Sequence, residues 1–371
     1  MGRQSAPVAA LWYIVAIAFS AADPRIAGGS EEYGGILMDA TATIVGTTTW
    51  GTTLGVLLAR RSVPVTLLAR TAAEAEGLNA HRENRRFLPG IPFPDCLRVE
   101  DDPEPALGRA KLVIFAVPSE HFRRNVRQVA AFLPPRATVV SASKGLELPG
   151  GRRMSQILAE ELPPALRSGI CVLSGPNLAR EIAQEKPAAT VVAGGEPARA
   201  ALVQEMLLSP SFRVYTSDDV VGVELGGTLK NIIALGAGIA DGLELGQNSK
   251  STLISRGLAE MSRLGMAAGA QYQTFAGLAG LGDLVATCYS QLSRNRYAGE
   301  QLARGRAWPE IRESMQNVVE GVNTTGAALA MAERLNVEMP IARVTYRILF
   351  EDLPPREAIA ELMGRPPHAE W

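Results

Sequence analysis

Lys230 has the setting of a proton-transfer residue, because it is a lysine inside an apolar, helix-like segment, Leu225–Ala234. The chain has 32 arginines and only five lysines among its 371 residues, so it uses arginine where it needs plain positive charge. Burial disfavours an ammonium group and lowers its pKa, which lets such a lysine give and take a proton near neutral pH. The alternative is a side chain that extends along the apolar surface to reach water.

The turn Gly46-Thr47-Thr48-Thr49-Trp50-Gly51 could bind the pyrophosphate of a dinucleotide. It ends an apolar strand and opens a helix, whose N-terminal N–H groups can hold an anion. Gly46 and Gly51 match the first and third glycines of the GxGxxG fingerprint, but Thr48 stands at the second. A plain strand-to-helix turn is the alternative.

Arg70 lies at the end of the next strand, Pro64–Arg70. NAD-binding sheets usually place Asp or Glu here for the ribose 2′-hydroxyl, whereas Arg can pair with the 2′-phosphate of NADP. Because no acid ends this strand, we expect NADPH to be accepted as well as NADH. A solvated surface arginine is equally compatible with the pattern.

Three polar loops follow apolar strands further along the chain. Pro118-Ser119 follows 112–117, Ser143-Lys144-Gly145 follows 137–142, and the segment from Ser174 to Glu181 follows 170–173. Ligands of open parallel sheets bind outside the carboxyl ends of the strands, so we expect these loops to share one site. Each loop taken singly could be ordinary turn chemistry.

Two polar clusters lie in the C-terminal part. Asp283 belongs to a glycine-rich turn, Gly277–Leu284, and could be a site residue or a helix cap. Ser293-Arg294-Asn295-Arg296 is basic, and a guanidinium can make a two-pronged contact with phosphate. A helix N-terminus with solvated arginines is the alternative for this cluster.

The elements that must position these residues fall into two groups. Strand-like and helix-like segments alternate up to about residue 219, which is typical of βαβ units. After Val220 the segments are rich in Ala, Leu, Gly and Met with helical spacing. We therefore predict an α/β fold: a doubly wound, Rossmann-type, parallel-sheet dinucleotide-binding domain over 38–219, and an all-helical substrate-binding domain over 220–366.

Residues 1–37 differ from the rest of the chain. Arg3 precedes an apolar run, Val8–Ala22, which resembles a secretory signal and is shorter than the roughly 20 residues of a membrane span. We favour a translation start assigned too far upstream, with Met38 as the true first residue. This N-terminal extension is then disordered or dispensable.

Composition excludes several classes of protein. With 37 basic and 38 acidic residues the formal charge is −1, which argues against a nucleic-acid or anionic-membrane protein. Three dispersed cysteines form no disulfide framework and no CxxC pair, and the three histidines are scattered. We therefore expect no metal site.

Taken together, the motifs resemble those of the bacterial NAD(P)-dependent glycerol-3-phosphate dehydrogenases. They occur in order over about 41–366, and the ordered set is more specific than any member. The motifs are Gly46…Trp50-Gly51-Thr52, Asn84…Phe87-Leu88-Pro89-Gly90, Ser143-Lys144-Gly145-Leu146-Glu147, Ser174-Gly175-Pro176-Asn177, Phe212-Arg213-Val214-Tyr215, Leu225–Asn231, Gly257–Met261, Leu281–Leu284, Ser293–Arg296 and Val319-Glu320-Gly321.

The resemblance implies reversible reduction of dihydroxyacetone phosphate to sn-glycerol 3-phosphate, a phospholipid precursor, by a cytoplasmic homodimer using NAD or NADP. It implies Lys230 as the general acid/base. It implies substrate contacts from Lys144, Gly175, Asn177, Lys230, Asp283, Ser293, Arg294 and Asn295. It implies cofactor contacts from Gly46, Thr49, Trp50, Gly51, Arg70, Lys144, Ala179, Arg294, Val318 and Glu320.

This chain departs from the family pattern at two site positions. Asn177 replaces a Ser or Thr, and Thr48 replaces a glycine. Two rival hypotheses stay open. A related two-domain reductase could act on ketopantoate or a 3-hydroxyacid, against which Arg294-Asn295 speaks. A dinucleotide-binding module could have lost turnover, against which Lys144, Lys230 and Asp283 speak.

Overall fold

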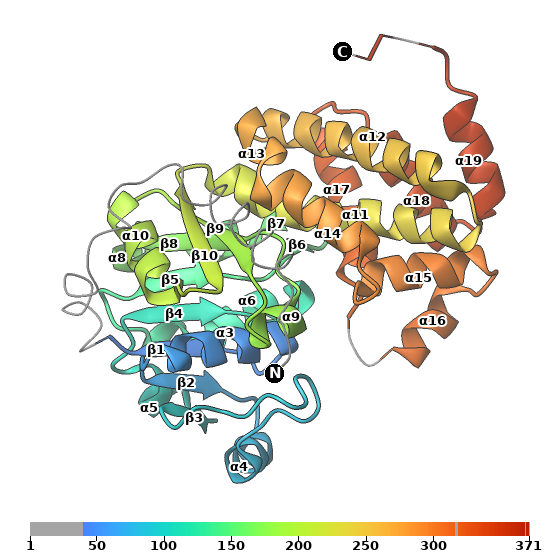
Figure 1. Cartoon of the computed structure of the whole chain (residues 1–371). Helices are drawn as coiled ribbons and strands as arrows, with labels where there is room; N and C mark the ends of the chain where they lie inside the picture. Colours follow the sequence, from blue (N-terminus) through green and yellow to red (C-terminus); the bar gives the residue numbers. More distant parts are fainter. Residues whose placement is uncertain (1–39, 316–317, 368, 371) are drawn as a thin grey trace, which may run out of the picture. The chain divides into compact units, whose positions relative to one another are not determined.

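The structure is a computed structural model that describes residues 40–315, 318–367 and 369–370 (Figure 1). The predicted extension 1–37 and its boundary at Met38 lie outside these residues. Within the described part, strands run through the blue-to-green first half and long helices through the yellow-to-red second half (Figure 1).

One eight-stranded sheet organises the first half. Its strand order is β10-β9-β8-β5-β4-β1-β2-β3, and every neighbouring pair is parallel except β8 and β9. The strands are β1 (Ala42–Val45), β2 (Val65–Leu68), β3 (Leu97–Glu100), β4 (Leu112–Phe115), β5 (Thr138–Ser141), β8 (Ile170–Ser174), β9 (Ala188–Gly194) and β10 (Phe212–Ser217).

The Rossmann-type α/β fold class is confirmed, but the expectation of a purely parallel sheet is wrong at one edge. β9 and β10 run against the other strands. Between β8 and β9 the chain forms only a five-residue helix, α9 (Ala179–Ala183), instead of the long crossover that a parallel return requires. The pair β6 (Leu146–Glu147) and β7 (Arg152–Arg153) forms a separate antiparallel ribbon.

Burial explains which strands the sequence pattern reveals. β1, β2, β4 and β5 are buried at every residue, and central parallel strands read as continuous apolar runs. β3 and β10 lie at the two edges and carry charged or polar residues in alternation. The remaining helices of this half are α3 (Thr49–Arg60), α4 (Ala72–His81), α5 (Pro103–Leu107), α6 (Phe122–Val129), α7 (Met154–Glu161), α8 (Pro164–Arg167) and α10 (Pro197–Leu207), with 3₁₀ turns η2 (Ser119–His121) and η3 (Ala130–Phe132).

Helix α11 (Val220–Gly242) is the centre of the second half. It contacts α12, α14, α15 and α17, and Asp219 caps it by accepting a hydrogen bond from the Gly222 N–H at 2.8 Å. The other elements are α12 (Gly246–Ala267), α13 (Tyr272–Ala276), η4 (Leu278–Gly282, a π-helix), α14 (Asp283–Tyr289), α15 (Arg294–Ala303), α16 (Trp308–Ser314), α17 (Glu320–Arg334), α18 (Pro340–Phe350) and α19 (Pro355–Met363).

By length and composition alone, α11 could also cross a membrane. It is the one such helix in the described part of the chain, and 83% of its most apolar window is buried inside the protein. That burial is what a core helix of a globular domain requires.

Helices α11 and α15 pack backbone against backbone. A Cβ atom on Gly238 would lie 1.9 Å from the Arg296 carbonyl oxygen, and one on Gly299 would lie 2.0 Å from the Leu235 carbonyl oxygen. Glycine is therefore required at both faces of this contact. The approach sets the position of the N-terminus of α15, which carries Arg294.

We predict that Gly238→Ala lowers the free energy of unfolding by about 1–3 kcal/mol, because the added methyl group displaces backbone rather than a flexible side chain. Gly326→Ala in α17 is the matched control, since its nearest neighbour is Tyr346 Cε2 at 3.7 Å. The control should gain about 0.5–1 kcal/mol from helix propensity. Urea unfolding measures both, and equal stability of the two variants would contradict the close-packing argument.

Candidate active site

The three polar loops lie together at one edge of the sheet. β4, β5 and β8 are parallel neighbours, so their carboxyl ends point the same way. The Lys144 ammonium group donates to the Gly175 carbonyl oxygen at 3.0 Å, and a Cβ on Gly145 would lie 2.3 Å from Ser119 Oγ. The prediction that these loops share one place is confirmed.

Asp283 joins two lysines from different halves of the fold. Its Oδ2 accepts from Lys144 Nζ at 2.6 Å, and its Oδ1 accepts from Lys230 Nζ. Lys230 Nζ also donates to Thr287 Oγ1 at 2.6 Å. The Asp283 side chain is 1% exposed and that of Lys230 is 8% exposed, so the bridge is shielded from water.

Burial lowers the pKa of Lys230 from its ordinary 10.5 to about 8. The Asp283 carboxylate opposes this change by stabilising the ammonium form, and the Lys144 charge adds to it. The Lys230 amine can therefore be protonated or neutral within the physiological pH range. That is the property required of a general acid that is reloaded in every turnover.

A π-helix delivers Asp283 to this position. η4 ends at Gly282, and Asp283 is the first residue of α14. A Cβ on Gly280 would lie 2.1 Å from the Phe275 carbonyl oxygen, and one on Gly226 of α11 would lie 2.6 Å from the Ala279 carbonyl oxygen. This turn therefore sits directly on α11, and single π-turns of this kind often occur at functional sites.

Two buried polar atoms at the end of β8 and in the loop after it have no partner among the described residues, namely Ser174 Oγ and Asn177 Oδ1. The Asn177 amide nitrogen donates to Thr190 Oγ1 at 3.0 Å, which leaves its oxygen free. Buried polar atoms normally have partners, so this group indicates the place of a polar ligand.

Arg294 is the first residue of α15, and its guanidinium group can bind an anion. It is exposed and has no ion pair among the described residues, while Ser293 caps the helix by accepting from the Arg296 N–H at 3.2 Å. The side chain of Asn295, by contrast, is already hydrogen-bonded within the protein. It donates to Asn231 Oδ1 and accepts from the Gly321 N–H, each at 2.9 Å. Its geometry supports positioning more than ligand contact.

Glu320, the first residue of α17, ties the helical half to the sheet edge. Its carboxylate accepts from the Ser119 N–H at 3.2 Å and from Ser119 Oγ at 2.5 Å. Burial raises the pKa of Glu320, and these bonds work against that rise. Val318, the other predicted contact in this segment, is half-buried two residues earlier.

The first βα turn fits a dinucleotide. Gly46 has φ +111°, and a Cβ there would lie 2.7 Å from Val117 Cγ1, so only glycine suits this turn. Thr48, at φ −65°, has a backbone conformation that does not itself require glycine. It caps α3, accepting from the Gly51 N–H at 3.1 Å and donating to the Ala116 carbonyl oxygen at 2.8 Å. A Cβ on Gly51 would lie 2.2 Å from the Gly46 carbonyl oxygen.

Thr49 and Trp50 lie at the first two positions of α3, where backbone N–H groups have no intrahelical partner. Trp50 Nε1 is also buried without a partner among the described residues. Ala179 opens α9 beside this helix, and its carbonyl oxygen accepts from Thr53 Oγ1 at 3.4 Å. These donors suit a diphosphate.

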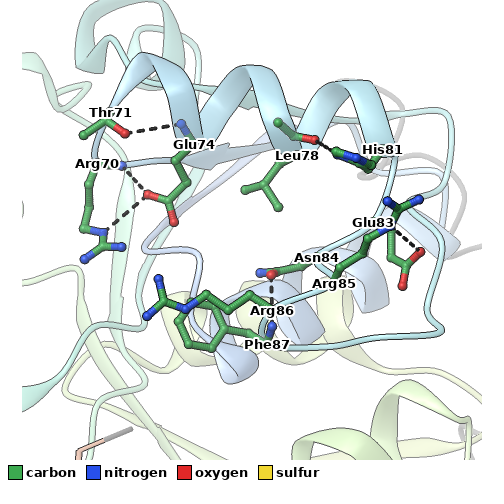
Figure 2. Close-up of a pocket in the computed structure, with 11 residues that line it drawn as sticks. Arg70, Thr71, Glu74, Leu78, His81, Glu83, Asn84, Arg85, Arg86 and Phe87 are labelled. Atoms are coloured by element: carbon green, nitrogen blue, oxygen red, sulfur yellow. Dashed lines mark hydrogen bonds and ion pairs between the residues drawn. The ribbon is translucent and has the colours of Figure 1, made fainter. Parts of the chain in front are cut away.

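Arg70 lies apart from the lysines, on a pocket of about 420 Å³ that α4 and the loop after it line (Figure 2). Its side chain is 68% exposed and meets Glu74, with Arg70 Nε 3.3 Å from Glu74 Oε2. No acid ends β2 itself, but Glu74 in the first turn of α4 brings a carboxylate to Arg70.

Sequence reasoning also missed Thr287 and the role of Ser119. Thr287 stands four residues after Asp283 on α14, a spacing that places both on one face of a helix. Within the described ranges there is no group of three or more His, Cys, Asp or Glu side chains that could hold a metal ion.

Comparison with known proteins agrees with this geometry. The family model described as NAD-dependent glycerol-3-phosphate dehydrogenase N-terminus matches residues 41–200, and the one described as its C-terminus matches residues 219–360. A Dehalococcoides mccartyi protein named glycerol-3-phosphate dehydrogenase [NAD(P)+] is 50% identical over 322 residues, covering 86% of this chain and 90% of its own. The protein of that name from Geobacter sulfurreducens is 48% identical over 327 residues, covering 88% and 98%.

The solved structures agree as well. The glycerol-3-phosphate dehydrogenase of Coxiella burnetii superimposes with a TM-score of 0.83 at 36% identity, over 88% of this chain and 99% of that one. The family models, the relatives and the solved structure all point to the same family. The buried Lys144–Asp283–Lys230 centre and the dinucleotide turn fit that family. The chain therefore belongs to the NAD-dependent glycerol-3-phosphate dehydrogenase family.

Proposed function

We propose that this protein reduces dihydroxyacetone phosphate reversibly to sn-glycerol 3-phosphate, with NADH or NADPH as cofactor and Lys230 as the proton donor. The observation that carries the proposal is the buried Lys144–Asp283–Lys230 bridge beside a dinucleotide turn. The names of the relatives supply the substrate.

The chemistry needs one hydride and one proton. A bound nicotinamide cofactor supplies the hydride, which forms the new C–H bond at the carbonyl carbon. Lys230 Nζ gives its proton to the carbonyl oxygen, so the ketone becomes a secondary alcohol and the lysine a neutral amine. Asp283 holds the Lys230 ammonium group in place before transfer, and solvent reloads the amine afterwards.

Substrate recognition is electrostatic in this proposal. Lys144 and Lys230 present positive charge to the anionic substrate, and Arg294 takes its phosphate at the N-terminus of α15. Ser174 Oγ, which is buried without a partner among the described residues, is available to the substrate hydroxyl group. The full substrate-binding set comprises Lys144, Gly175, Asn177, Lys230, Asp283, Ser293 and Arg294. Asn295, which the resemblance also implies, positions the start of α15 through its bonds to Asn231 and Gly321.

The first turn of α3 would hold the pyrophosphate of the cofactor in this proposal, with the start of α9 beside it. Domain 38–219 then binds the dinucleotide, and domain 220–366 binds the substrate. The cofactor set comprises Gly46, Thr49, Trp50, Gly51, Arg70, Lys144, Ala179, Arg294, Val318 and Glu320.

The direct test is the initial rate of NADH and NADPH oxidation with dihydroxyacetone phosphate, set beside 2-ketopantoate. Turnover of the phosphate ester and none of ketopantoate supports the proposal, and the reverse result refutes it. We further propose a cytoplasmic homodimer whose product enters glycerophospholipid synthesis. Sedimentation equilibrium tests the dimer, and a monomer mass would refute it.

We expect Lys230→Arg to lose about 10²–10⁴-fold in kcat, because a guanidinium cannot release its proton near neutrality. Lys144→Arg should keep more activity, since Lys144 acts through its charge. NADH affinity, measured by fluorescence, should survive in Lys230→Arg, because Lys230 is not among the proposed cofactor contacts. If Lys230→Arg kept more than about a tenth of the wild-type kcat, less than one decade of rate would depend on this proton and the role would pass to Lys144.

The pH dependence should have opposite signs in the two directions. Reduction requires protonated Lys230, so its kcat/KM should fall as pH rises through the lysine pKa of about 8. Oxidation of glycerol 3-phosphate requires the neutral amine, so its kcat/KM should rise over the same range. The substrate phosphate ionises at about pH 6 and contributes little there. Parallel profiles in both directions would be incompatible with Lys230 as the proton carrier.

We expect Arg294→Ala to reduce kcat/KM by about 30- to 1,000-fold, roughly 2–4 kcal/mol, mainly through KM for dihydroxyacetone phosphate. Arg304→Ala, at the residue directly after α15, is the control, because its exposed side chain pairs with Glu300. The control should retain wild-type kinetics. Unchanged kcat/KM in Arg294→Ala would make Arg294 an ordinary surface charge.

A further inference from the structure

Glu74 joins two segments of the dinucleotide-binding half. Its Oε1 accepts from Thr47 Oγ1 at 2.6 Å, and its Oε2 accepts from the Arg70 N–H at 3.1 Å and Arg70 Nε at 3.3 Å. Thr47 belongs to the turn after β1, and Arg70 follows β2. In Rossmann-type sheets these are the segments beside the pyrophosphate and the ribose 2′ position.

This carboxylate occupies the place of the acid that the end of β2 lacks. NAD-binding sheets use an Asp or Glu after the second strand to accept the ribose 2′-hydroxyl. Here α4 supplies it: Thr71 caps the helix, accepting from the Glu74 N–H at 3.2 Å, and the Glu74 side chain turns back to the Arg70 N–H. This arrangement resembles a capping box, except that the Glu74 side chain accepts from the N–H of Arg70 and not from that of the N-cap residue Thr71.

Glu74 is charged and has a free acceptor position. Burial alone would raise the pKa of Glu74, but the hydrogen bonds from Thr47 and Arg70 bring it below its ordinary value. A carboxylate offers about four lone-pair positions, and three hydrogen bonds are present. The remaining position, on Oε1, can accept a ribose hydroxyl.

The pocket beside Glu74 carries opposing charges. Figure 2 shows its carboxylate directed into the pocket, with the guanidinium groups of Arg70 and Arg86 on the same side of the opening. Arg86 lies over the Phe87 ring, 4.9 Å from its centroid. A 2′-phosphate would therefore meet two cations and one carboxylate, whereas a 2′-hydroxyl can donate directly to Glu74.

We propose that Glu74 is the specificity-determining residue for the choice between NADH and NADPH. Its carboxylate accepts the 2′-hydroxyl of NADH, offsets the Arg70 charge and repels the 2′-phosphate of NADPH. Arg70 can bind the 2′-phosphate only when its guanidinium group is not paired with Glu74. This inference rests on the proposed function for the identity of the cofactor.

The test is Glu74→Gln, which removes the charge and keeps the shape. The ratio of kcat/KM for NADPH to that for NADH should rise about tenfold, because the repulsive element is gone while Arg70 and Arg86 remain. The binding readout is calorimetric titration with 2′,5′-ADP and with 5′-AMP, which differ only in the 2′-phosphate. The affinity ratio of these two nucleotides should rise in parallel.

Glu76→Gln is the matched control, since it removes the same charge from an exposed position on the same helix. It should leave both ratios unchanged. Adding Arg70→Gln to Glu74→Gln should reduce the gain, because the Arg70 guanidinium that Glu74→Gln releases is one of its two sources; loss of the repulsive charge is the other. Melting temperatures of all three variants establish that they fold.

An unchanged or lower 2′,5′-ADP to 5′-AMP ratio in folded Glu74→Gln would overturn the inference, as would an equal rise in Glu76→Gln. The nucleotide titrations need no substrate. Absence of dihydroxyacetone phosphate turnover in the wild-type protein would therefore refute the proposed function, while the titrations would still decide the role of Glu74.

Discussion

The site depends on one buried carboxylate shared by two ammonium groups. Asp283 is 1% exposed, and each of its oxygens holds one lysine. Two cations so close together and removed from water would repel each other and lose their protons without it. Lys144 comes from the sheet edge and Lys230 from the central helix, so the charge balance also determines how these two elements meet.

That constraint explains the small residues of α11. A Cβ on Gly227 would lie 2.0 Å from Ser174 Oγ and 3.6 Å from Asp283 Oδ2, so the strand β8 and the aspartate approach the helix backbone itself. Apolar side chains at such positions would hold the three elements apart. Most residues of α11 are apolar and form the core. Glycine replaces the larger apolar residues where polar groups must approach Lys230.

The sequence predicts the parts of the site that are local. A lysine in an apolar helix and polar loops after buried strands are visible in one segment each, and the parallel order of β4, β5 and β8 brings those loops together. Lys230 and Asp283 are 53 residues apart in the sequence, so the spacing of residues along one helix or strand cannot predict their contact. Edge strands β3 and β10 escape prediction because charged residues interrupt their apolar pattern.

The balance of charges at the proposed site connects substrate binding with proton transfer. Around the proposed reacting carbonyl, Lys144, Lys230 and Arg294 face Asp283 and Glu320, which leaves a small positive excess when all five are ionised. A phosphorylated ketone brings negative charge into this water-poor site, and nearby negative charge favours the ammonium form of a lysine. In the proposed mechanism, substrate binding therefore raises the pKa of Lys230, so that its proton is present when the hydride arrives. The phosphate, which takes no part in the bond changes, acts on catalysis through this field, and a ketone without it would meet a lysine already partly deprotonated at pH 8.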